Sequence, residues 1–267
     1  MSEATRDPGR RDMGRRDPDR GTEQRTMVQP GDAIVPGARG TPTTVKRYGP
    51  LARLNHWIVA FSLIALALSG LALFSPALYF LTGLFGGGQN TRWIHPWIGV
   101  LLFVSFYVFF AQLWRANLPN RDDLTWLTRF RDVVAGHEER LPEMGKYNAG
   151  QKIVFWGMSA LILVLIVTGV AIWQEYFAPY TAIETQRWAA LIHAAAAIVM
   201  ILIWITHVYA SIWIQGTMRA MTRGNVTAGW AYRHHRKWLK QLAALGRRQA
   251  PEPNATERTK AAKHLGL

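Results

Sequence analysis

The chain has 267 residues, and its 31 lysines and arginines outnumber its 17 aspartates and glutamates, which gives a formal net charge of +14. Hydrophobic residues make up 49% of the sequence and charged residues 18%, but the basic residues gather toward the two ends and leave long uncharged stretches between them. This partition excludes a single, evenly mixed soluble domain. Because the chain has no cysteine, it also excludes a disulfide framework, thiolate zinc, iron–sulfur ligation and a cysteine nucleophile. Any metal chemistry must use the eight histidines.

The first 45 residues are rich in arginine, aspartate, proline and glycine and contain no apolar run longer than three residues. Such a composition cannot bury enough apolar surface to fold, so residues 1–45 are predicted to form a disordered basic tail. The pairs Arg10–Arg11 and Arg15–Arg16 are reminiscent of a twin-arginine export signal. No apolar segment follows them at signal-peptide distance, which favours a solvated tail instead.

Residues 46–218 carry four apolar stretches, each near the length of about 20 helical residues that crosses a hydrocarbon layer about 30 Å thick. The predicted spans are residues 55–74, 94–114, 153–173 and 188–214, and no aspartate, glutamate, lysine or arginine occurs in them. Tryptophans at the ends of the spans are typical of a membrane interface. The sequence therefore predicts an all-α membrane protein, a bundle of four transmembrane helices.

The basic residues outside the spans predict the orientation, because loops rich in lysine and arginine remain in the cytoplasm. Residues 1–53, 115–152 and 219–267 contain 29 of these residues, against 2 in the other two connections, Arg92 and Arg187. Both termini and the loop of residues 115–152 are therefore expected in the cytoplasm. Since topology accounts for the basic charge, nucleic-acid binding is not expected.

The C-terminal segment, residues 219–267, is expected to be cytoplasmic and basic. Its first part mixes apolar and basic residues, so a stretch within residues 218–245 is predicted to form an amphipathic helix on the inner membrane surface.

Four histidines lie in or at the ends of the spans, where ionisable groups are rare and usually functional. Given the orientation, His56 and His207 lie at the cytoplasmic depth, while His95 and His193 lie near the outer face. His193 and His207 are 14 residues apart, which on a helix is about 21 Å and roughly 40° short of four full turns, so both project from one face. The sequence therefore predicts two sites stacked across the bundle, each with two histidines.

Two histidines without carboxylates are too few for a lone metal ion. A haem brings four nitrogens of its own, so each pair is predicted to hold the iron of one b haem from both sides, which favours electron transfer over oxygen chemistry. Gly70 lies 14 residues after His56, so it either lets the other haem approach the backbone or serves ordinary helix packing. The remaining histidines are expected to be solvated: His137, His234, His235 and His264.

The run GKYNAGQK, residues 145–152, precedes the third span on the cytoplasmic side. Asn148 and Gln151 are able to hydrogen-bond a quinone carbonyl, and Gly150 would allow its close approach. A plain helix-entry turn explains the same residues equally well.

Five motifs at matching intervals resemble those of the gamma subunits of respiratory formate dehydrogenases, which are membrane cytochromes b. The motifs are Leu54-Asn55-His56-Trp57, Ile94-His95-Pro96, the run GKYNAGQK, Leu191-Ile192-His193-Ala194-Ala195-Ala196 and Thr206-His207-Val208-Tyr209. The resemblance covers about residues 46–242, and the run GKYNAGQK is its most distinctive part.

The resemblance implies two b haems, one on His56 and His207 and one on His95 and His193. It also implies a menaquinone or ubiquinone pocket near His207, Asn148, Gly150 and Gln151. Formate would be oxidised by a molybdenum- or tungsten-containing alpha subunit that carries molybdopterin, and an iron–sulfur beta subunit would pass the electrons to the outer haem. No residue of this chain would bind formate or act as a catalytic residue in its oxidation.

Two alternatives remain open from the sequence. A cytochrome b subunit of a hydrogenase or thiosulfate reductase would use the same helices and haems. A haem-free membrane anchor or transporter component belongs to a different class, and the depth-matched histidines and the uncharged spans argue against it.

Overall fold

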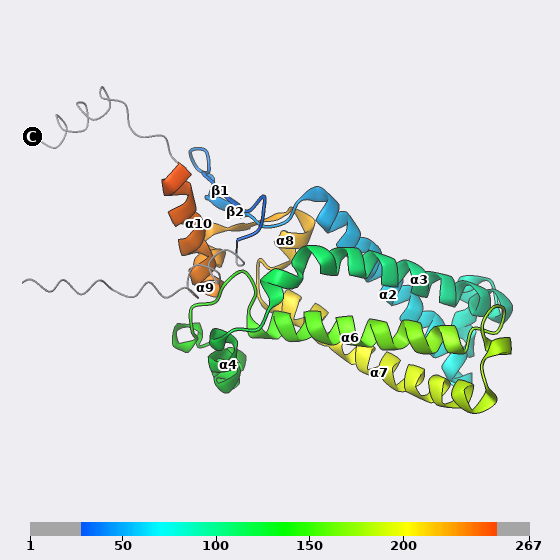
Figure 1. The fold of residues 1–267 in the computed structure, drawn as a ribbon. Helices are drawn as coiled ribbons and strands as arrows, with labels where there is room; N and C mark the ends of the chain where they lie inside the picture. The colour runs from blue at the N-terminus through cyan, green and yellow to red at the C-terminus, as the bar shows by residue number, and fades with distance from the viewer. Residues whose placement is uncertain (1–27, 250–267) are drawn as a thin grey trace, which may run out of the picture.

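The computed structural model describes residues 28–249, and four long helices form the main body (Figure 1). They are α2 (Pro50–Phe74), α3 (Gly88–Leu113), α6 (Ala149–Ala171) and α7 (Ile183–Trp213). All four are long and apolar enough to cross a membrane. The predicted fold class, an all-α bundle of four transmembrane helices, is confirmed.

Each long helix begins four to six residues before the predicted span. At α6 the cause is a capping box, in which Asn148 and Gln151 satisfy each other's backbone N–H groups and start the helix before the apolar run. Lys152 therefore lies in the first turn of α6 and is buried. The predicted spans carry no charged residue, and the longer helices of the structure add charged residues such as Lys152 only near their ends.

In the bundle α2 packs along α3, α6 packs along α7, and α3 packs against α6. Polar contacts fix two of these pairs: Asn55 Nδ2 donates to the Ser105 carbonyl oxygen at 2.8 Å, and the Tyr107 hydroxyl donates to the Ser159 carbonyl oxygen at 2.9 Å. The buried apolar centre draws on all four helices. It consists of Leu63, Leu102, Phe106, Ile162 and Met200.

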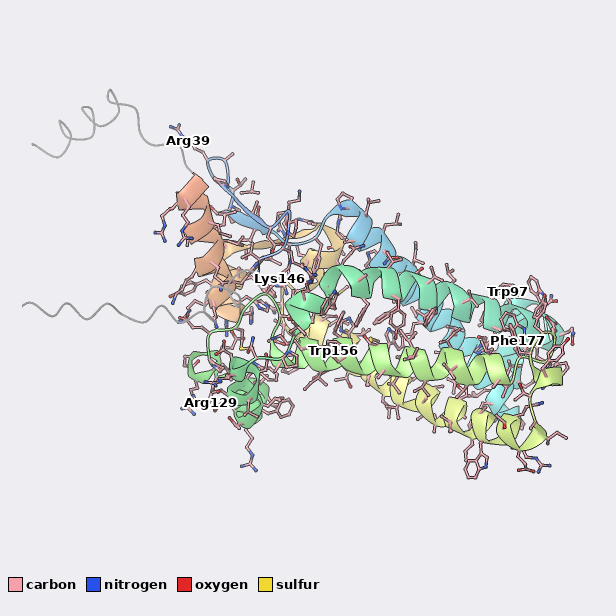
Figure 2. The ribbon with its side chains drawn as sticks, in the orientation of Figure 1. Arg39, Trp97, Arg129, Lys146, Trp156 and Phe177 are labelled. Carbon is pink, nitrogen blue, oxygen red and sulfur yellow. The ribbon has the colours of Figure 1, made fainter. Side chains whose placement is uncertain are left out.

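One end of the bundle is closed by short connections, η1 (Pro76–Phe85) and η4 (Ala178–Tyr180). Trp97 and Phe177 lie at this end, and Lys146 lies at the opposite end (Figure 2). Trp173 packs edge-on against Trp97, with ring centroids 5.1 Å apart, and also contacts Phe177. At the Lys146 end, the connection between α3 and α6 folds into four short helices. They are η2 (Trp114–Asn117), α4 (Arg121–Thr128), α5 (Phe130–Val134) and η3 (Glu138–Arg140).

Beyond the Lys146 end of the bundle, residues 28–48 and 218–249 form a small unit that we call the terminal cap (Figure 1). Its antiparallel sheet has the order β1 (Ala33–Val35), β2 (Thr44–Lys46), β3 (Asn225–Thr227), and Val45 pairs with both Ile34 and Val226. Three helices complete it. They are α8 (Met218–Thr222), α9 (Ala228–His234) and α10 (Arg236–Gln249).

The cap corrects the prediction of a disordered tail over residues 28–45. Within them, β1 pairs with β2, and the carboxylate of Asp32 forms a buried ion pair with Lys146. The local composition does not reveal these contacts, because Lys146, the partner of Asp32, and β3, the second partner of β2, come from distant parts of the sequence. Residues 1–27, with the paired arginines, lie outside the described residues.

The predicted C-terminal amphipathic helix corresponds in part to α10, but its apolar side chains pack into the cap. The chain is interrupted at Gly224, whose positive φ of 79° ends α8, and then forms β3, α9 and α10. The apolar side chains Trp230, Trp238 and Leu242 are buried in one cluster with Val45. Protein rather than lipid therefore covers the apolar face.

Candidate functional site

His95 of α3 and His193 of α7 meet near the end of the bundle that lies away from the cap. Their ring centroids are 6.4 Å apart, with an angle of 64° between the ring planes. The two histidines that the sequence assigned to one depth thus come together from different helices.

A hydroxyl group from a third and a fourth helix fixes the tautomer of each ring. Ser69 Oγ donates its hydrogen to the Ala65 carbonyl oxygen at 2.7 Å, so toward His95 Nδ1, also at 2.7 Å, it accepts. On α6, Thr168 Oγ1 donates to the Val164 carbonyl oxygen at 2.7 Å and accepts from His193 Nδ1 at 2.9 Å. Both rings carry their hydrogen on Nδ1, which leaves the Nε2 lone pairs for a metal.

A glycine next to each hydroxyl makes room for the ring. A Cβ atom on Gly70 would lie 3.3 Å from His95 Cε1, and a Cβ atom on Gly169 would lie 3.3 Å from His193 Cε1. Gly70 therefore accommodates His95, a third possibility beside the two considered from the sequence. Thr168 and Gly169 were not predicted from the sequence, and Ser69 was considered only for helix packing with Gly70, although the repeated hydroxyl–glycine pair, Ser69-Gly70 and Thr168-Gly169, was a usable signal.

His56 and His207 come together nearer the cap. Their imidazoles are close enough to interact electrostatically. The ring of His56 packs edge-on against Trp57 and Phe109, with centroid distances of 5.7 and 6.4 Å. His56 Nδ1 is buried and has no hydrogen-bond partner among the described residues. The structure thus reproduces both predicted pairs, one toward each end of the bundle.

The residues present fit a haem at the His95–His193 pair. A metal-bound imidazole holds its nitrogen about 2 Å from the metal, and the ring centre lies about 1 Å farther out. Two imidazoles on opposite sides of one metal ion therefore have centres about 6 Å apart, close to the observed 6.4 Å. No group of three histidine, aspartate or glutamate side chains arranged for a metal ion occurs within residues 28–249. Two imidazoles suit a metal that arrives with four ligands of its own.

The run GKYNAGQK leads into the first turn of α6, and hydrogen bonds fix the orientation of its two side-chain amides. Asn148 Oδ1 accepts from the Gln151 backbone N–H at 2.9 Å, and Gln151 Oε1 accepts from the Asn148 backbone N–H at 3.1 Å. Both amide oxygens are therefore engaged in the capping box. Neither amide nitrogen, Asn148 Nδ2 or Gln151 Nε2, donates a hydrogen bond within the part of the chain that the structure describes. Two donors remain for a ligand.

Gly150 has a packing role in the structure. A Cβ atom there would lie 3.2 Å from Cη2 of Trp126, whose indole packs against the start of α6 from α4. The missing side chain thus lets α4 approach α6. This contact explains Gly150 without the quinone carbonyl for which the sequence suggested it.

Buried charges hold Lys146 and Tyr147, the residues directly before Asn148. Lys146 Nζ lies 2.6 Å from Asp32 Oδ1, with 1% of each side chain exposed. Burial lowers the pKa of Lys146, and the Asp32 carboxylate opposes that shift. Burial likewise raises the pKa of the Tyr147 hydroxyl. The guanidinium of Arg47 lies over the rings of Tyr147, Trp230 and Trp238 at 5.3 to 5.5 Å from their centroids.

His235 belongs to the same buried cluster, so its predicted solvation is wrong. Only 1% of it is exposed, and its Nδ1 donates to the Gly145 carbonyl oxygen at 2.7 Å. Burial, reinforced by the nearby charge of Arg47, holds the pKa of His235 well below its usual value. His234 is half-buried beside Glu138, its Nδ1 3.2 Å from the Glu138 carboxylate, whereas His137 is exposed, as predicted. His264 lies outside the described residues.

Comparison with known proteins agrees with this arrangement. The family model for prokaryotic cytochrome b561 matches residues 47–224. The cytochrome b556(fdo) subunit of formate dehydrogenase from Escherichia coli K12 is 40% identical over 207 residues, which are 78% of this chain and 97% of the relative. The nitrate-inducible cytochrome b556(Fdn) subunit from the same organism is 40% identical over 190 residues, 71% of this chain and 88% of the relative.

A formate dehydrogenase cytochrome b556 subunit from Haemophilus influenzae is 34% identical over 199 residues, 74% of this chain and 84% of the relative. Four apolar helices, two histidine pairs and these matches agree on one family. The family implies haem b and electron transfer, which argues against the haem-free anchor or transporter. The chain is a membrane protein that belongs to the prokaryotic cytochrome b561 family.

Proposed function

We propose that this chain is the membrane cytochrome b subunit of a formate dehydrogenase complex and carries electrons through two b haems to a quinone. The observation that carries the proposal is the His95–His193 pair, whose ring separation of 6.4 Å suits two axial imidazoles. The three relatives described above are named as formate dehydrogenase cytochrome b556 subunits, which favours formate over hydrogen or thiosulfate as the source of electrons.

In this proposal His95 and His193 hold the haem farther from the cap, and His56 and His207 hold the haem nearer to it. A haem with imidazole on both sides supplies one-electron transfer and has no open position for oxygen. The chain itself fixes the ligands. Ser69 and Thr168 orient the rings of the first pair, and the buried His56 Nδ1 offers a polar atom to the second site.

The count of basic residues, 29 against 2, supports a cytoplasmic cap in a bacterial inner membrane. The haem on His95 and His193 would then lie toward the outer face, where an iron–sulfur subunit would deliver electrons from a molybdopterin-containing catalytic subunit. Formate oxidation belongs to that catalytic subunit, and this chain contributes the transfer of electrons inward.

We place the quinone, menaquinone or ubiquinone, at the start of α6, near His207. Asn148 Nδ2 and Gln151 Nε2 are the atoms assigned to its carbonyl oxygen, because both amide oxygens are held by the capping box. Gly150 keeps α4 close to this turn through Trp126. The same turn thus starts the helix and presents two donors.

The haem assignment is tested on the purified chain by pyridine haemochrome quantitation, which should approach two haems per polypeptide. His95→Ala and His193→Ala should each remove one haem and leave the other spectrally intact. A haem content near zero in the wild type would refute the electron-transfer role. Retention of both haems in these variants would refute the ligand assignment.

The quinone assignment calls for variants that keep the capping box. Asn148→Asp and Gln151→Glu retain the accepting oxygen but replace the amide nitrogen by a second oxygen, so they remove the proposed donors and add a negative charge. A buried hydrogen bond contributes about 1 to 3 kcal/mol when its loss leaves a polar group unpaired, so the KM for a quinone analogue should rise about 5-fold to 150-fold. Formate reduction of an artificial dye and the haem content should persist.

Asn120→Asp is the matched control, because Asn120 and Asp123 form the corresponding capping box at α4. The control should leave the KM for quinone unchanged. Unchanged quinone kinetics in all three variants would place the quinone elsewhere and leave the run GKYNAGQK as a helix entrance.

A further inference from the structure

Reduction of a quinone consumes two electrons and two protons, and the proposed quinone site contains no residue suited to supply the protons. The amides of Asn148 and Gln151 do not titrate, and an imidazole on iron, as proposed for His207, has its Nε2 occupied. A proton must therefore reach the quinone oxygen from a neighbouring group. This inference rests on the proposed function.

Two ionisable groups flank this turn along the chain: Tyr147, directly before Asn148, whose hydroxyl burial makes a weaker acid by raising its pKa, and Lys152, directly after Gln151. Its Nζ lies 2.7 Å from Asp123 Oδ2, and the two side chains are 7% and 9% exposed. A buried ion pair is a weak stabilising device, because desolvation offsets most of the attraction. An ionisable residue in the first turn of a membrane helix is more often functional than structural.

Only one of the two carboxylate oxygens of Asp123 has hydrogen-bond partners among the described residues. Its Oδ2 accepts from Lys152 Nζ at 2.7 Å and from the Asn120 backbone N–H at 2.7 Å. Its Oδ1 is buried and has no hydrogen-bond partner among the described residues. Leaving a carboxylate oxygen unpaired is costly, and a bound water is the usual remedy.

Other charged residues beside the pair are exposed to solvent, and they pair with partners of their own or face the water directly. Asp122, the neighbour of Asp123 on α4, pairs with Lys237 of α10 at 2.7 Å, and both side chains are 32% exposed. Arg121 begins the same helix and is exposed. Lys152 is the one charged residue of α6. The charged residues of α3 and α7 lie near the opposite end of the bundle, so at the cap end these two helices contribute His207 as an ionisable residue. The pair thus lies between a solvated charged surface and Gln151.

We propose that Asp123, held by Lys152, takes up protons from the water on the cap side and passes them to the quinone. An O–H bond forms at Asp123 Oδ1 and breaks as the proton moves through a water to a quinone oxygen, where a new O–H bond forms. Two such transfers balance the two electrons that arrive from the proposed haem on His56 and His207. Each transfer leaves Asp123 as a carboxylate again, held 2.7 Å from Lys152 Nζ.

The test uses the assembled complex, with Asp123→Asn as the main variant. Asparagine keeps an oxygen that accepts from the Asn120 backbone N–H but cannot carry a proton. Reoxidation of the reduced haems by a water-soluble quinone analogue, followed by stopped-flow absorbance, should slow at least about 100-fold, the low end of the usual cost of losing an acid–base group. The rate should also fall steeply with rising pH, and the KM for quinone should not change.

Two further variants separate a proton role from a structural one. Asp122→Asn removes the neighbouring, half-exposed carboxylate and should leave the rate and its pH profile unchanged. Asp123→Glu should restore part of the rate. In the infrared difference spectrum between oxidised and quinol-reduced complex, a carboxyl band should be present in the wild type and absent from Asp123→Asn.

The outcomes distinguish this proposal from the function on which it rests. Haems that quinone fails to reoxidise in the wild type would refute the proposed function. Normal reoxidation in both the wild type and Asp123→Asn, with an unchanged pH profile, would overturn the proton role alone. A raised KM together with lost haem in Asp123→Asn would also overturn it, because it would show that the pair merely shapes the start of α6.

Discussion

Lys146 Nζ and Asp32 Oδ1 form a buried ion pair at 2.6 Å between residues 114 positions apart. The pair ties the first strand of the terminal cap to the loop that enters α6. Lys146 Nζ also donates to Gln29 Oε1 at 2.6 Å, and Trp238 Nε1 donates to Asp32 Oδ2 at 3.1 Å. Two residues before the capping amide of Asn148, the chain is therefore held by groups from both terminal segments.

Asp32→Asn should open the cap, because it leaves the Lys146 ammonium buried without a counter-charge. Breaking a buried pair from one side typically costs about 3 to 5 kcal/mol. Hydrogen exchange measured by mass spectrometry should become faster in residues 33–48 and 225–242, while exchange in the centres of α3 and α6 stays slow.

Lys240→Met is the control for this prediction. Its partner Glu143 lies 2.6 Å away, but the two side chains are 63% and 41% exposed, and exposed pairs contribute little to stability. Equal exchange in the wild type and Asp32→Asn would show that the ion pair does not hold the cap.

The cap should lose stability as the pH falls below about 6.5, the ordinary pKa of histidine. The pKa of His235 is well below that value in the folded cap, so in acid the unfolded cap binds a proton that the folded cap does not. Each pH unit below about 6.5 then costs up to about 1.4 kcal/mol until the folded histidine titrates, whereas stability above that pH does not depend on this group.

Hydrogen exchange of residues 225–242 between pH 5 and pH 8, corrected for intrinsic rates, measures this dependence. His235→Gln retains a donor for the Gly145 carbonyl oxygen but does not titrate, so its profile should be flatter. The half-buried His234, whose pKa is also lowered chiefly by burial, should supply the slope that remains. A profile in His235→Gln as steep as in the wild type would contradict the assignment.

The bundle was predictable from the sequence because a run of about 20 apolar residues forms few structures other than a membrane-spanning helix. The histidine pairing followed from helix direction and the rise of each residue, and the structure brings both pairs together. The helix starts were missed by four to six residues. At α6 a capping box starts the helix before its apolar run, and at α2 a proline in the first turn does so.

The terminal cap was not predictable, since its contacts connect residues far apart. β1 has three residues and lies in a segment whose composition indicates disorder. It is held by β2 and by Lys146, which local patterns do not reveal. His235 was misjudged for the same reason: its basic neighbours suggest solvent, whereas Trp230 and Trp238 of the folded cap bury it.

Ser69→Ala and Thr168→Val should weaken or retune the haem proposed at His95 and His193 without removing it. Each variant deletes the oxygen that accepts from a ligand's Nδ1, and loss of such a partner commonly costs about 10-fold to 100-fold in metal affinity. A potentiometric titration of the haems should show one midpoint shifted and the other unchanged.

Ser159→Ala is the matched control for these hydroxyls. Ser159 is buried in α6 and donates to the Phe155 carbonyl oxygen at 2.7 Å, as Thr168 donates to Val164, but within residues 28–249 its side chain makes no hydrogen bond to an imidazole. Ser159→Ala should leave the midpoint potentials of both haems unchanged. A shift of both midpoints in Ser69→Ala would mean that the hydroxyl acts on the whole bundle rather than on one ligand.

Gly70→Ala and Gly169→Ala should displace the rings of His95 and His193. The added methyl group would lie 3.3 Å from Cε1 of the facing imidazole in both cases, a contact that the ring must relieve by moving. A ring held by a hydroxyl at Nδ1 and by iron at Nε2 has little freedom to do so, so the variants should lose one haem or show an altered spectrum for it.

Gly157→Ala supplies the comparison, because its methyl group would meet only the terminal methyl of Ile203, at 3.4 Å. That contact is ordinary packing, and alanine is favoured over glycine in a helix by about 1 kcal/mol. Haem content per polypeptide, measured beside the low-temperature absorption spectrum, should therefore fall in Gly70→Ala and Gly169→Ala and stay at the wild-type value in Gly157→Ala. Full haem content with unaltered spectra in the first two variants would show that the imidazoles at this pair tolerate a shift, and that the hydroxyl–glycine pairs serve helix packing alone.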